Sequence, residues 1–495
     1  MNRHISDVEL KASRLRELAR AALIEHGMLP EFPNAVRNEL AQIPGPAQPD
    51  WNGGVKDLRD MLWCSIDNDS SKDLDQLSAS MPLPDGATRI FVAIADVDAL
   101  VRKGSSIDLH ASRNTCSIYT PAQIFPMIPE RLSNDISSLN YDEDRMALVV
   151  QYDIAPDGTL AGSDLFRAAV RNKAKLAYSS IGAWLDGRGE LPSAAASAPG
   201  LAESLIAQDA VAQKLKKLRH ENGALDLESP DPKPAIEGGR IYYGTAERGN
   251  RAKLLIEDFM IAANGVGARM LAAKGFPAIR RIVKTPKRWE RIVELARERN
   301  YRLPSSPDSK ALEAFLEASK PADPVLFQEL SFNVMKLLGP GEYAVEDAKA
   351  PKAGHFGLAV KDYAHSTAPN RRYADLVTHR LFKAALAGRP CPYDHESLEA
   401  VARRCTLMED AAKKVERRLN KSAVALMLED RIGETFDAIV TGASPKGTWV
   451  RISAPPVEGR LDAGYEGLDV GDRCRVRLVH TDPEKGYIDF RKVRS

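Results

Sequence analysis

Four aspartates fall within nine consecutive positions of the chain, in the segment SIDNDSSKDLDQ. Carboxylates this close repel one another, so a fold holds them best where a cation lies among them. The apolar residues MLWCSI predict a strand that ends at Asp67. If the chain is extended further on, Asp73 and Asp75 share one face and Leu74 takes the other. Converging carboxylate oxygens suit Mg²⁺ or Mn²⁺, while an acidic surface turn explains the spacing equally well.

A second cluster, HSTAPNRRYADLVTHR, begins at His365. The pattern turns helical after Pro369, which predicts that Arg371 lies in the first turn of a helix. A helix N-terminus with guanidinium groups is an anion site, although an arginine pair at a helix start also fits a surface salt bridge. His365 and His379 are expected to pack or to contact phosphate, because no other ligands stand at metal spacing. Acidic and basic clusters together favour metal-assisted phosphoryl chemistry on a polyanion.

The chain of 495 residues is long enough for about three domains. Residues 1–50 are expected to form a short helical module, with a helix-turn-helix-like arrangement as one option. Residues 51–432 predict a large mixed α/β domain that ends in a long helix from about residue 397. Residues 433–495 alternate apolar and polar positions between glycine turns, as in a five-stranded OB-fold β-barrel. The expected fold class is therefore α+β with several domains.

The apolar stripe of that long helix could form a coiled-coil dimer, but we expect it to pack onto the preceding domain. The expected oligomeric state is therefore a monomer. The 69 Lys+Arg and 68 Asp+Glu give a net charge of +1, which excludes a polycationic tail but not locally segregated charge. No apolar run approaches the ~20 residues of a membrane span, and the first residues are too charged for a signal peptide. The five cysteines are scattered and indicate neither a disulfide framework nor a zinc site. A reduced, cytoplasmic protein without membrane contact is expected.

The two clusters resemble signatures of one enzyme family. The acidic segment is similar to the signature SID–five residues–DxDD of the ribonuclease II/ribonuclease R (RNB) superfamily, and YAHSTAPNRRYADLVTHR is similar to its second signature, YxHFTSPIRRYxDLxxHR. Further matches follow in order between them, among them IADV, FPMIPERLSNDISSL and IEDFMIAAN. The resemblance runs from about residue 60 to 430, and the C-terminal barrel resembles the OB-fold RNA-binding domain that ends these enzymes.

The resemblance implies a processive 3′→5′ exoribonuclease that hydrolyses RNA to nucleoside 5′-monophosphates with Mg²⁺, or with Mn²⁺ as a substitute. It places Asp67, Asp73 and Asp75 on the catalytic, metal-binding aspartates of the family. Gln76 stands at a fourth metal-binding position, where the family has aspartate. Arg371 matches the arginine that contacts the scissile phosphate. The implied partner is the 3′ end of single-stranded RNA, with no small-molecule cofactor.

The same resemblance implies a set of RNA contacts. Tyr119 falls on the aromatic residue that stacks near the RNA 3′ end, and Trp449 falls where the OB fold presents a stacking aromatic. Glu416 aligns with an active-site glutamate, and Glu257 is a candidate for a ribose contact. Arg372, beside the phosphate-contacting arginine, is the fifth candidate.

Several positions depart from the family pattern. Because Gln76 brings no charge, a second metal is expected to bind more weakly, and the extra Asp69 is a hypothetical compensation. In the barrel, Lys446 and Asp462 replace usual RNA-contacting residues, and the ten basic and ten acidic residues predict a weak, electrostatic grip on RNA. Family members usually carry two cold-shock OB domains first, but some fifty helical residues cannot form one, so duplexes with a short 3′ overhang should be attacked more readily.

Two other functions stay open at this point. The first is an RNA-binding regulator on a catalytically weakened RNB scaffold, which Gln76 alone supports. The second is an OB-fold protein that acts in translation, which explains only the last 63 residues.

Overall fold

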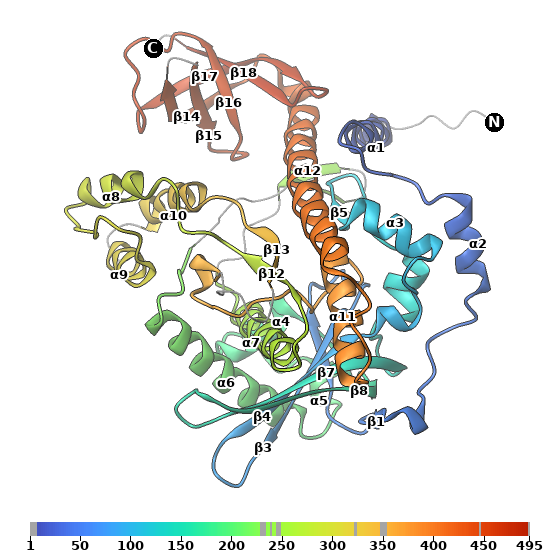
Figure 1. Ribbon diagram of the computed structural model, residues 1–495. Coiled ribbons are helices and arrows are strands. Elements are labelled where there is room, and N and C mark those ends of the chain that lie inside the picture. Colours follow the sequence, from blue (N-terminus) through green and yellow to red (C-terminus); the bar gives the residue numbers. More distant parts are fainter. Residues whose placement is uncertain are drawn as a thin grey trace.

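The fold was analysed in a computed structural model, which describes residues 7–227, 234–237, 240–243, 249–320, 324–346, 354–444 and 447–493. A mixed α/β body carries a small β-barrel at one end, and one long helix runs from the body to the barrel (Figure 1). The predicted helical start, α/β body and five-stranded barrel are all confirmed. In the same parts of the chain, no helix combines the length and the apolar character needed to cross a membrane.

The body is built on a seven-stranded sheet with the order β1-β8-β7-β4-β3-β2-β9. The inner neighbours are antiparallel, whereas β1 pairs with β8 and β9 pairs with β2 in parallel. The sheet strands are β1 (Lys56–Asp57), β2 (Cys64–Asp67), β3 (Gln76–Pro82), β4 (Thr88–Ala95), β7 (Asp144–Ile154), β8 (Leu160–Arg171) and β9 (Ala174–Ala177). Strands β4 and β7 lie near its centre and are buried along nearly their whole length, so both faces of the sheet are covered.

The helices of the body that pack around the main core are α3 (Ser106–Asn114), α4 (Tyr178–Leu185), α5 (Ser193–Ala196), α6 (Leu201–Glu221), α7 (Arg251–Ala273) and α11 (Tyr373–Leu386). Three more helices, α8 (Trp289–Arg297), α9 (Ser309–Ser319) and α10 (Pro324–Leu338), pack on one another around a separate apolar core. The ribbons and remaining short pairs are β5 (Ile118–Tyr119) with β6 (Ile124–Phe125), β10 (Pro234–Glu237) with β11 (Arg240–Tyr243), and β12 (Ala278–Ile282) with β13 (Glu342–Glu346).

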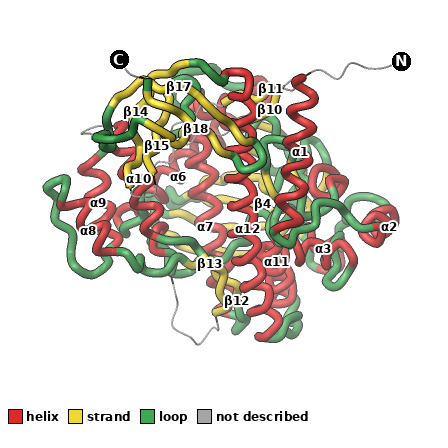
Figure 2. Tube along the Cα trace, turned by 90° about the horizontal axis from the view of Figure 1, so that it is seen from above, coloured by secondary structure: helices red, strands yellow, loops and turns green. Residues whose placement is uncertain are grey.

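Helix α7 is the central helix of the body and packs on the sheet (Figure 2). Asn250 caps it by accepting hydrogen bonds from the backbone N–H groups of Ala252 and Lys253. At Gly267 an added Cβ would lie 2.4 Å from the ring of Phe382 in α11, so only glycine permits this close helix contact.

The N-terminal helices α1 (Asp7–Glu25) and α2 (Asn34–Gln42) dock separately. Helix α1 buries Leu15 and Ala19 against the long helix, while α2 buries Val36 in the main core of the body. Helix α1 ends before Gly27, whose φ of +74° is the left-handed conformation that glycine adopts readily. Residues 7–43 therefore do not pack as a self-contained helix-turn-helix unit, because each apolar face is covered by the body instead.

The long helix is α12 (His395–Leu428), close to the predicted span. Its apolar stripe, which includes Met408 and Val415, packs against α1 and the β5–β6 region within the chain. Its last turns contribute Val424 and Leu428 to the core of the barrel, so the helix fixes the position of the barrel relative to the body. The closed barrel has the order β14-β15-β16-β18-β17, with strands β14 (Thr435–Ser444), β15 (Gly447–Ile452), β16 (Glu458–Ala463), β17 (Arg473–Asp482) and β18 (Tyr487–Lys492).

Candidate active site

The acidic segment joins two neighbouring strands of the sheet. Asp67 is the last residue of β2, as predicted, and Gln76 is the first residue of β3. Leu74 is 1% exposed in the core, which holds Asp73 and Asp75 on either side of it. Strand β4 also fixes this end of the loop, since Ala95 N donates a 2.9 Å hydrogen bond to the carbonyl oxygen of Asp75.

A guanidinium from the far end of the sequence meets this loop. Arg371 Nε donates to Asp75 Oδ2 at 2.7 Å, across 296 positions of sequence. On the other side, Gln76 Nε2 donates to Asp67 Oδ1 at 3.4 Å. The predicted cationic partner of the acidic cluster is therefore Arg371, whose side chain is 41% exposed and faces outward from the buried Asp75.

The electrostatics of the two buried carboxyl groups are unusual. Burial raises the pKa of Asp67 to about 7, and the charge of Asp75 adds to the rise. Burial likewise raises the pKa of Asp75 to about 6, although Arg371 opposes it. The charge of Asp73 acts on both groups in the same upward direction. A desolvated pair of like charges with one guanidinium is a site that a further cation would stabilise.

The donor set fits a divalent cation. Asp67 Oδ2 and Asp75 Oδ1 are buried without a hydrogen-bond partner, which is costly for a carboxylate unless an ion satisfies it. Among the described residues no three Asp, Glu, His or Cys side chains already stand as a metal-ligand group. Mg²⁺ accepts such a partial shell, because it binds one or two carboxylates and completes its coordination with water and substrate phosphate.

The arginine segment differs from the prediction in one respect. Helix α11 begins at Tyr373, so Arg371 lies before the helix and not in its first turn. The physical reason is pairing with residues 115–117: Ser117 N donates to the carbonyl oxygen of Arg371 at 3.0 Å, and Tyr373 N donates to that of Thr115 at 2.8 Å. These hydrogen bonds between distant segments hold Arg372 extended opposite Cys116, while Arg371 lies in the turn before it.

Polar contacts hold the residues that flank Arg371. Arg372 donates to the fully buried Asp375 at 2.7 Å and to Thr367 Oγ1 at 3.3 Å. His379 Nε2 lies 2.7 Å from the carbonyl oxygen of Ser366, and burial lowers its pKa. In the same way, His365 lies 2.8 Å from Tyr343 Oη and burial lowers its pKa. Both imidazoles are therefore neutral packing residues, one of the two roles expected of them.

Tyr119 and Glu416 are brought together at this site. Tyr119, at the end of β5, donates its backbone N–H to Glu416 Oε1 of α12 at 3.0 Å. Burial raises the pKa of the Tyr119 phenol, and the charges of Arg371, Asp73 and Asp75 also act on it. The half-exposed ring is free on its outer side to meet a base.

The other two candidate RNA contacts lie elsewhere. Glu257 is exposed on α7, where its charge acts on Asp258 and Tyr363. Trp449 lies on the outer face of β15, opposite Arg460 of β16 and with Gly442 of β14 against its ring. In the same barrel Asp462 is bound by Arg491 at 2.7 Å, and Lys446 lies outside the described residues.

Tyr178 is a site residue that the sequence analysis missed. It begins α4, and burial together with the charge of Asp67 raises the pKa of its phenol, while Arg371 lowers it. The Lys253 ammonium lies 5.7 Å from its ring centroid. Strand β9 ends one residue earlier, opposite Asp67, and parallel strands present their carboxyl ends at one edge. Only the pairing of β9 with β2 indicates that Tyr178 lies near Asp67, and the sequence does not reveal which strands pair.

The hypothetical compensating residue, Asp69, is exposed and turns toward α4. Its Oδ2 accepts a 3.0 Å hydrogen bond from Ser179 Oγ.

Comparison with known proteins identifies the family. Residues 55–388 match the RNB domain, and residues 434–493 match the RNase II-type exonuclease C-terminal S1 domain. The chain belongs to the RNB-domain family of nucleases, with the S1 barrel at its C-terminal side. The family and fold class that the two motifs predicted are thus confirmed.

Within this family the chain is similar to proteins named Ribonuclease R. It is 30% identical to Ribonuclease R of Thermotoga maritima, over 93% of this chain and 68% of the relative. It superposes on the apo form of Mycoplasma genitalium RNase R with a TM-score of 0.84 at 23% identity, over 97% of this chain and 78% of that one. Yeast Ssd1, described as a pseudonuclease, superposes with a TM-score of 0.71 at 16% identity, over 96% of this chain and 58% of that one. The structural likenesses show the fold alone, and the chain spans 59–68% of the length of the relatives named Ribonuclease R.

Proposed function

We propose that this chain is a processive 3′→5′ exoribonuclease that hydrolyses RNA to nucleoside 5′-monophosphates, with Mg²⁺ as its metal and Mn²⁺ as a substitute. The observation that carries the proposal is the buried pair of Asp67 and Asp75, with unpartnered oxygens beside the guanidinium of Arg371. The family membership and the relatives' name support the reaction class.

The catalytic residues are Asp67, Asp73, Asp75 and Arg371. The three carboxylates and the amide of Gln76 would hold divalent ions, which lower the pKa of a water molecule and stabilise the leaving 3′ oxygen when bound. Arg371 Nε donates a hydrogen bond to Asp75. The exposed edge of the guanidinium can contact the scissile phosphate. Charge that develops on the phosphate oxygens would thus meet a fixed positive group.

The residues around this cluster would position the RNA. The Tyr119 ring is a stacking surface for a base near the 3′ end, and Glu416 holds its backbone in place. Glu257 is proposed for a ribose contact and Arg372 for a phosphate contact. Trp449, on the barrel, would stack on a base further from the cleaved end, because it is not part of the carboxylate cluster.

One assay tests the proposal. Labelled single-stranded RNA with Mg²⁺ is incubated with the wild type, with Asp75→Asn, and with Asp60→Asn as a matched control on an exposed turn. Nucleoside monophosphates from the wild type and the control, but not from Asp75→Asn, are the expected result. RNA binding without any product from the wild type would instead identify an RNA-binding regulator, the alternative that Gln76 supports.

The remaining properties are proposals of the same kind. We expect a monomer, because the stripe of α12 that could form a dimer is covered by α1 within the chain. A cytoplasmic location agrees with five free cysteines. The domain boundaries at residues 50 and 432, and the attack on duplexes with a short 3′ overhang, stay predictions. Complete stalling several nucleotides before every duplex would contradict the latter.

A further inference from the structure

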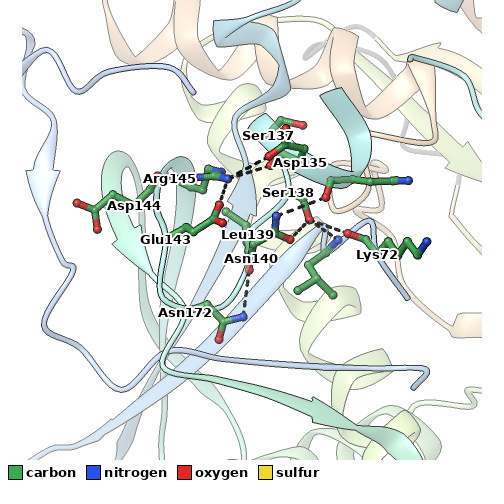
Figure 3. Close-up of polar contacts among 12 residues, drawn as sticks. Lys72, Asp135, Ser137, Ser138, Leu139, Asn140, Glu143, Asp144, Arg145 and Asn172 are labelled. Atoms are coloured by element: carbon green, nitrogen blue, oxygen red, sulfur yellow. Dashed lines mark hydrogen bonds and ion pairs between the residues drawn. The ribbon is translucent and has the colours of Figure 1, made fainter. Parts of the chain in front are cut away.

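A buried serine pair, Ser137 and Ser138, contacts both the acidic loop and the arginine segment, and Figure 3 shows the pair beside Lys72 of that loop. Ser137 and Ser138 are 4% and 0% exposed. They follow the π-helical turn η3 (Arg131–Ile136) directly. Such turns are rare and recur at functional sites. No role follows for these serines from the chemistry described so far.

Ser138 forms hydrogen bonds with the backbone on both sides of Asp73. Its Oγ accepts a hydrogen bond from Leu74 N and donates one to the carbonyl oxygen of Lys72, both at 2.9 Å. Next to it, Leu139 N donates to the carbonyl oxygen of Leu74 at 3.0 Å. The two peptide units that flank Asp73 are therefore both held by the Ser138 side chain, and the next peptide unit, between Leu74 and Asp75, is held by the backbone N–H of Leu139.

Ser137 contacts the other half of the site. Its Oγ lies 2.8 Å from Asn370 Oδ1 and 2.8 Å from the carbonyl oxygen of Leu132. Asn370 is 1% exposed and directly precedes Arg371. Two consecutive serines thus connect the loop that carries the carboxylates with the segment that carries the guanidinium.

The serine segment is itself anchored to the sheet. Asn172 Nδ2 donates to the carbonyl oxygen of Leu139 at 3.0 Å and to Ser65 Oγ, two residues before Asp67, at 3.1 Å. At the other end, Arg145 donates to the carbonyl oxygen of Asp135 at 3.0 Å (Figure 3). These contacts link the segment to β2 and β7, so it acts as a fixed reference for the acidic loop.

We propose that Ser138 is a positioning residue that presets the Asp73 carboxylate for metal binding. The inference rests on the proposed function in that it takes Asp73 as a metal ligand. Its physical basis is that residues 68–75, between β2 and β3, do not belong to a strand, so isolated contacts fix the loop conformation, and those at the two peptide units beside Asp73 come from Ser138. Partners that orient ligands in this way affect metal affinity strongly.

The test is direct Mn²⁺ binding, measured by electron paramagnetic resonance on the full chain without RNA. Ser138→Ala removes the hydroxyl that accepts from Leu74 N and that shares its one proton between the carbonyl oxygen of Lys72 and Asn140 Oδ1, each at 2.9 Å. The variant should weaken Mn²⁺ binding by about 10-fold or more. Ser133→Ala is the matched control: Ser133 is equally buried in the same segment, but its hydroxyl bonds only to the neighbouring Asn134. The control should bind Mn²⁺ like the wild type.

A double variant separates positioning from a general loss of structure. If Ser138 acts through Asp73, adding Ser138→Ala to Asp73→Asn should not weaken Mn²⁺ binding further. Independent, multiplying effects would overturn the inference, as would Ser138→Ala binding like the wild type. Should Ser138→Ala fail to fold, Ser138→Cys, with a weaker hydrogen-bonding group, carries the same comparisons.

The two proposals fail in different ways. A chain that binds Mn²⁺ but releases no nucleotides from RNA refutes the exoribonuclease and leaves the Ser138 inference standing. A chain that cleaves RNA and whose Ser138→Ala variant binds Mn²⁺ normally refutes the inference alone.

Discussion

At the scale of single residues, Asp67 and Asp75 are the groups that most define the site. Both sit at the end of a buried strand or loop, and both have their pKa raised mainly by burial. Arg371 offsets only part of this cost, since its single ion pair reaches Asp75. Burial therefore disfavours the charged form of both carboxyl groups, and a bound divalent cation would stabilise that form.

The raised pKa values predict how metal binding depends on pH. In the unfolded chain these groups titrate near 3.8, so their stabilising contribution to the metal-free fold is complete below pH 4 and is lost as the pH rises through 6 and 7. Protons and metal compete for the same oxygens, so apparent Mg²⁺ affinity should rise on the order of 10- to 100-fold from pH 5.5 to 8. Thermal unfolding with and without Mg²⁺ measures this. An equal Mg²⁺-induced shift at both pH values would contradict it.

Asp69 gives a second test at this scale. If its charge replaces the one that Gln76 lacks, Asp69→Asn should raise the Mg²⁺ concentration needed for half-maximal hydrolysis severalfold. Its contact with Ser179 provides the control, because Ser179→Ala removes that hydrogen bond and keeps the charge. An Mg²⁺ profile of Asp69→Asn identical to that of the wild type would refute compensation.

At the scale of elements, α12 connects the parts of the molecule. It carries Glu416, which holds the backbone of Tyr119, and its last turns enter the barrel core. Helix α1 covers its apolar stripe, and ion pairs such as Arg14–Glu429 and Arg418–Glu25 flank that contact. Exposed ion pairs of this kind contribute little, so the apolar contact must supply most of the docking energy.

Docking of α1 can be tested with two leucines of that helix. Leu15→Ala removes a fully buried side chain and should destabilise the docked helix by about 2–5 kcal/mol. Leu10→Ala, at a position 60% exposed, should change stability by less than about 0.5 kcal/mol. Hydrogen exchange of the α1 backbone measures both. Equal protection in the two variants would show that α1 is not held through its apolar face.

At the scale of the whole molecule, the proposed function divides chemistry and RNA holding between the body and the barrel. The carboxylates lie at and between strands of the central sheet, whereas Trp449 belongs to a closed barrel with its own core. Since α12 joins the two units and ends in the barrel core, a change on the outer face of the barrel should not reach the carboxylates.

This division predicts the effect of removing Trp449. Trp449→Ala should weaken single-stranded RNA binding by about 1–3 kcal/mol, the usual contribution of one stacked base, with the Mg²⁺ dependence of hydrolysis unchanged. Tyr465→Ala, another half-exposed aromatic of the barrel, is the control. Fluorescence anisotropy with labelled RNA measures the affinity, and a shifted Mg²⁺ profile in Trp449→Ala would contradict the division.

Sequence alone was sufficient for features that depend on local pattern. The strand that ends at Asp67, the long helix, the barrel and the chemical type of the acidic cluster all follow from spacing and periodicity, because each is encoded within a few dozen residues. The family motifs added the assignment of Arg371 to the same site, and the structure places it there.

Tertiary structure decided what depends on pairing between distant segments. Arg371 precedes its helix because its backbone pairs with residues 115–117, and Tyr178 directly follows the residue that pairs with Asp67 because β9 runs parallel to β2. The choice of α1 as the cover of the α12 stripe is of the same kind. Such contacts join residues far apart in the sequence, 393 positions in the case of Arg418 and Glu25, and no local preference of the chain specifies which distant partner will satisfy a buried charge or an apolar face.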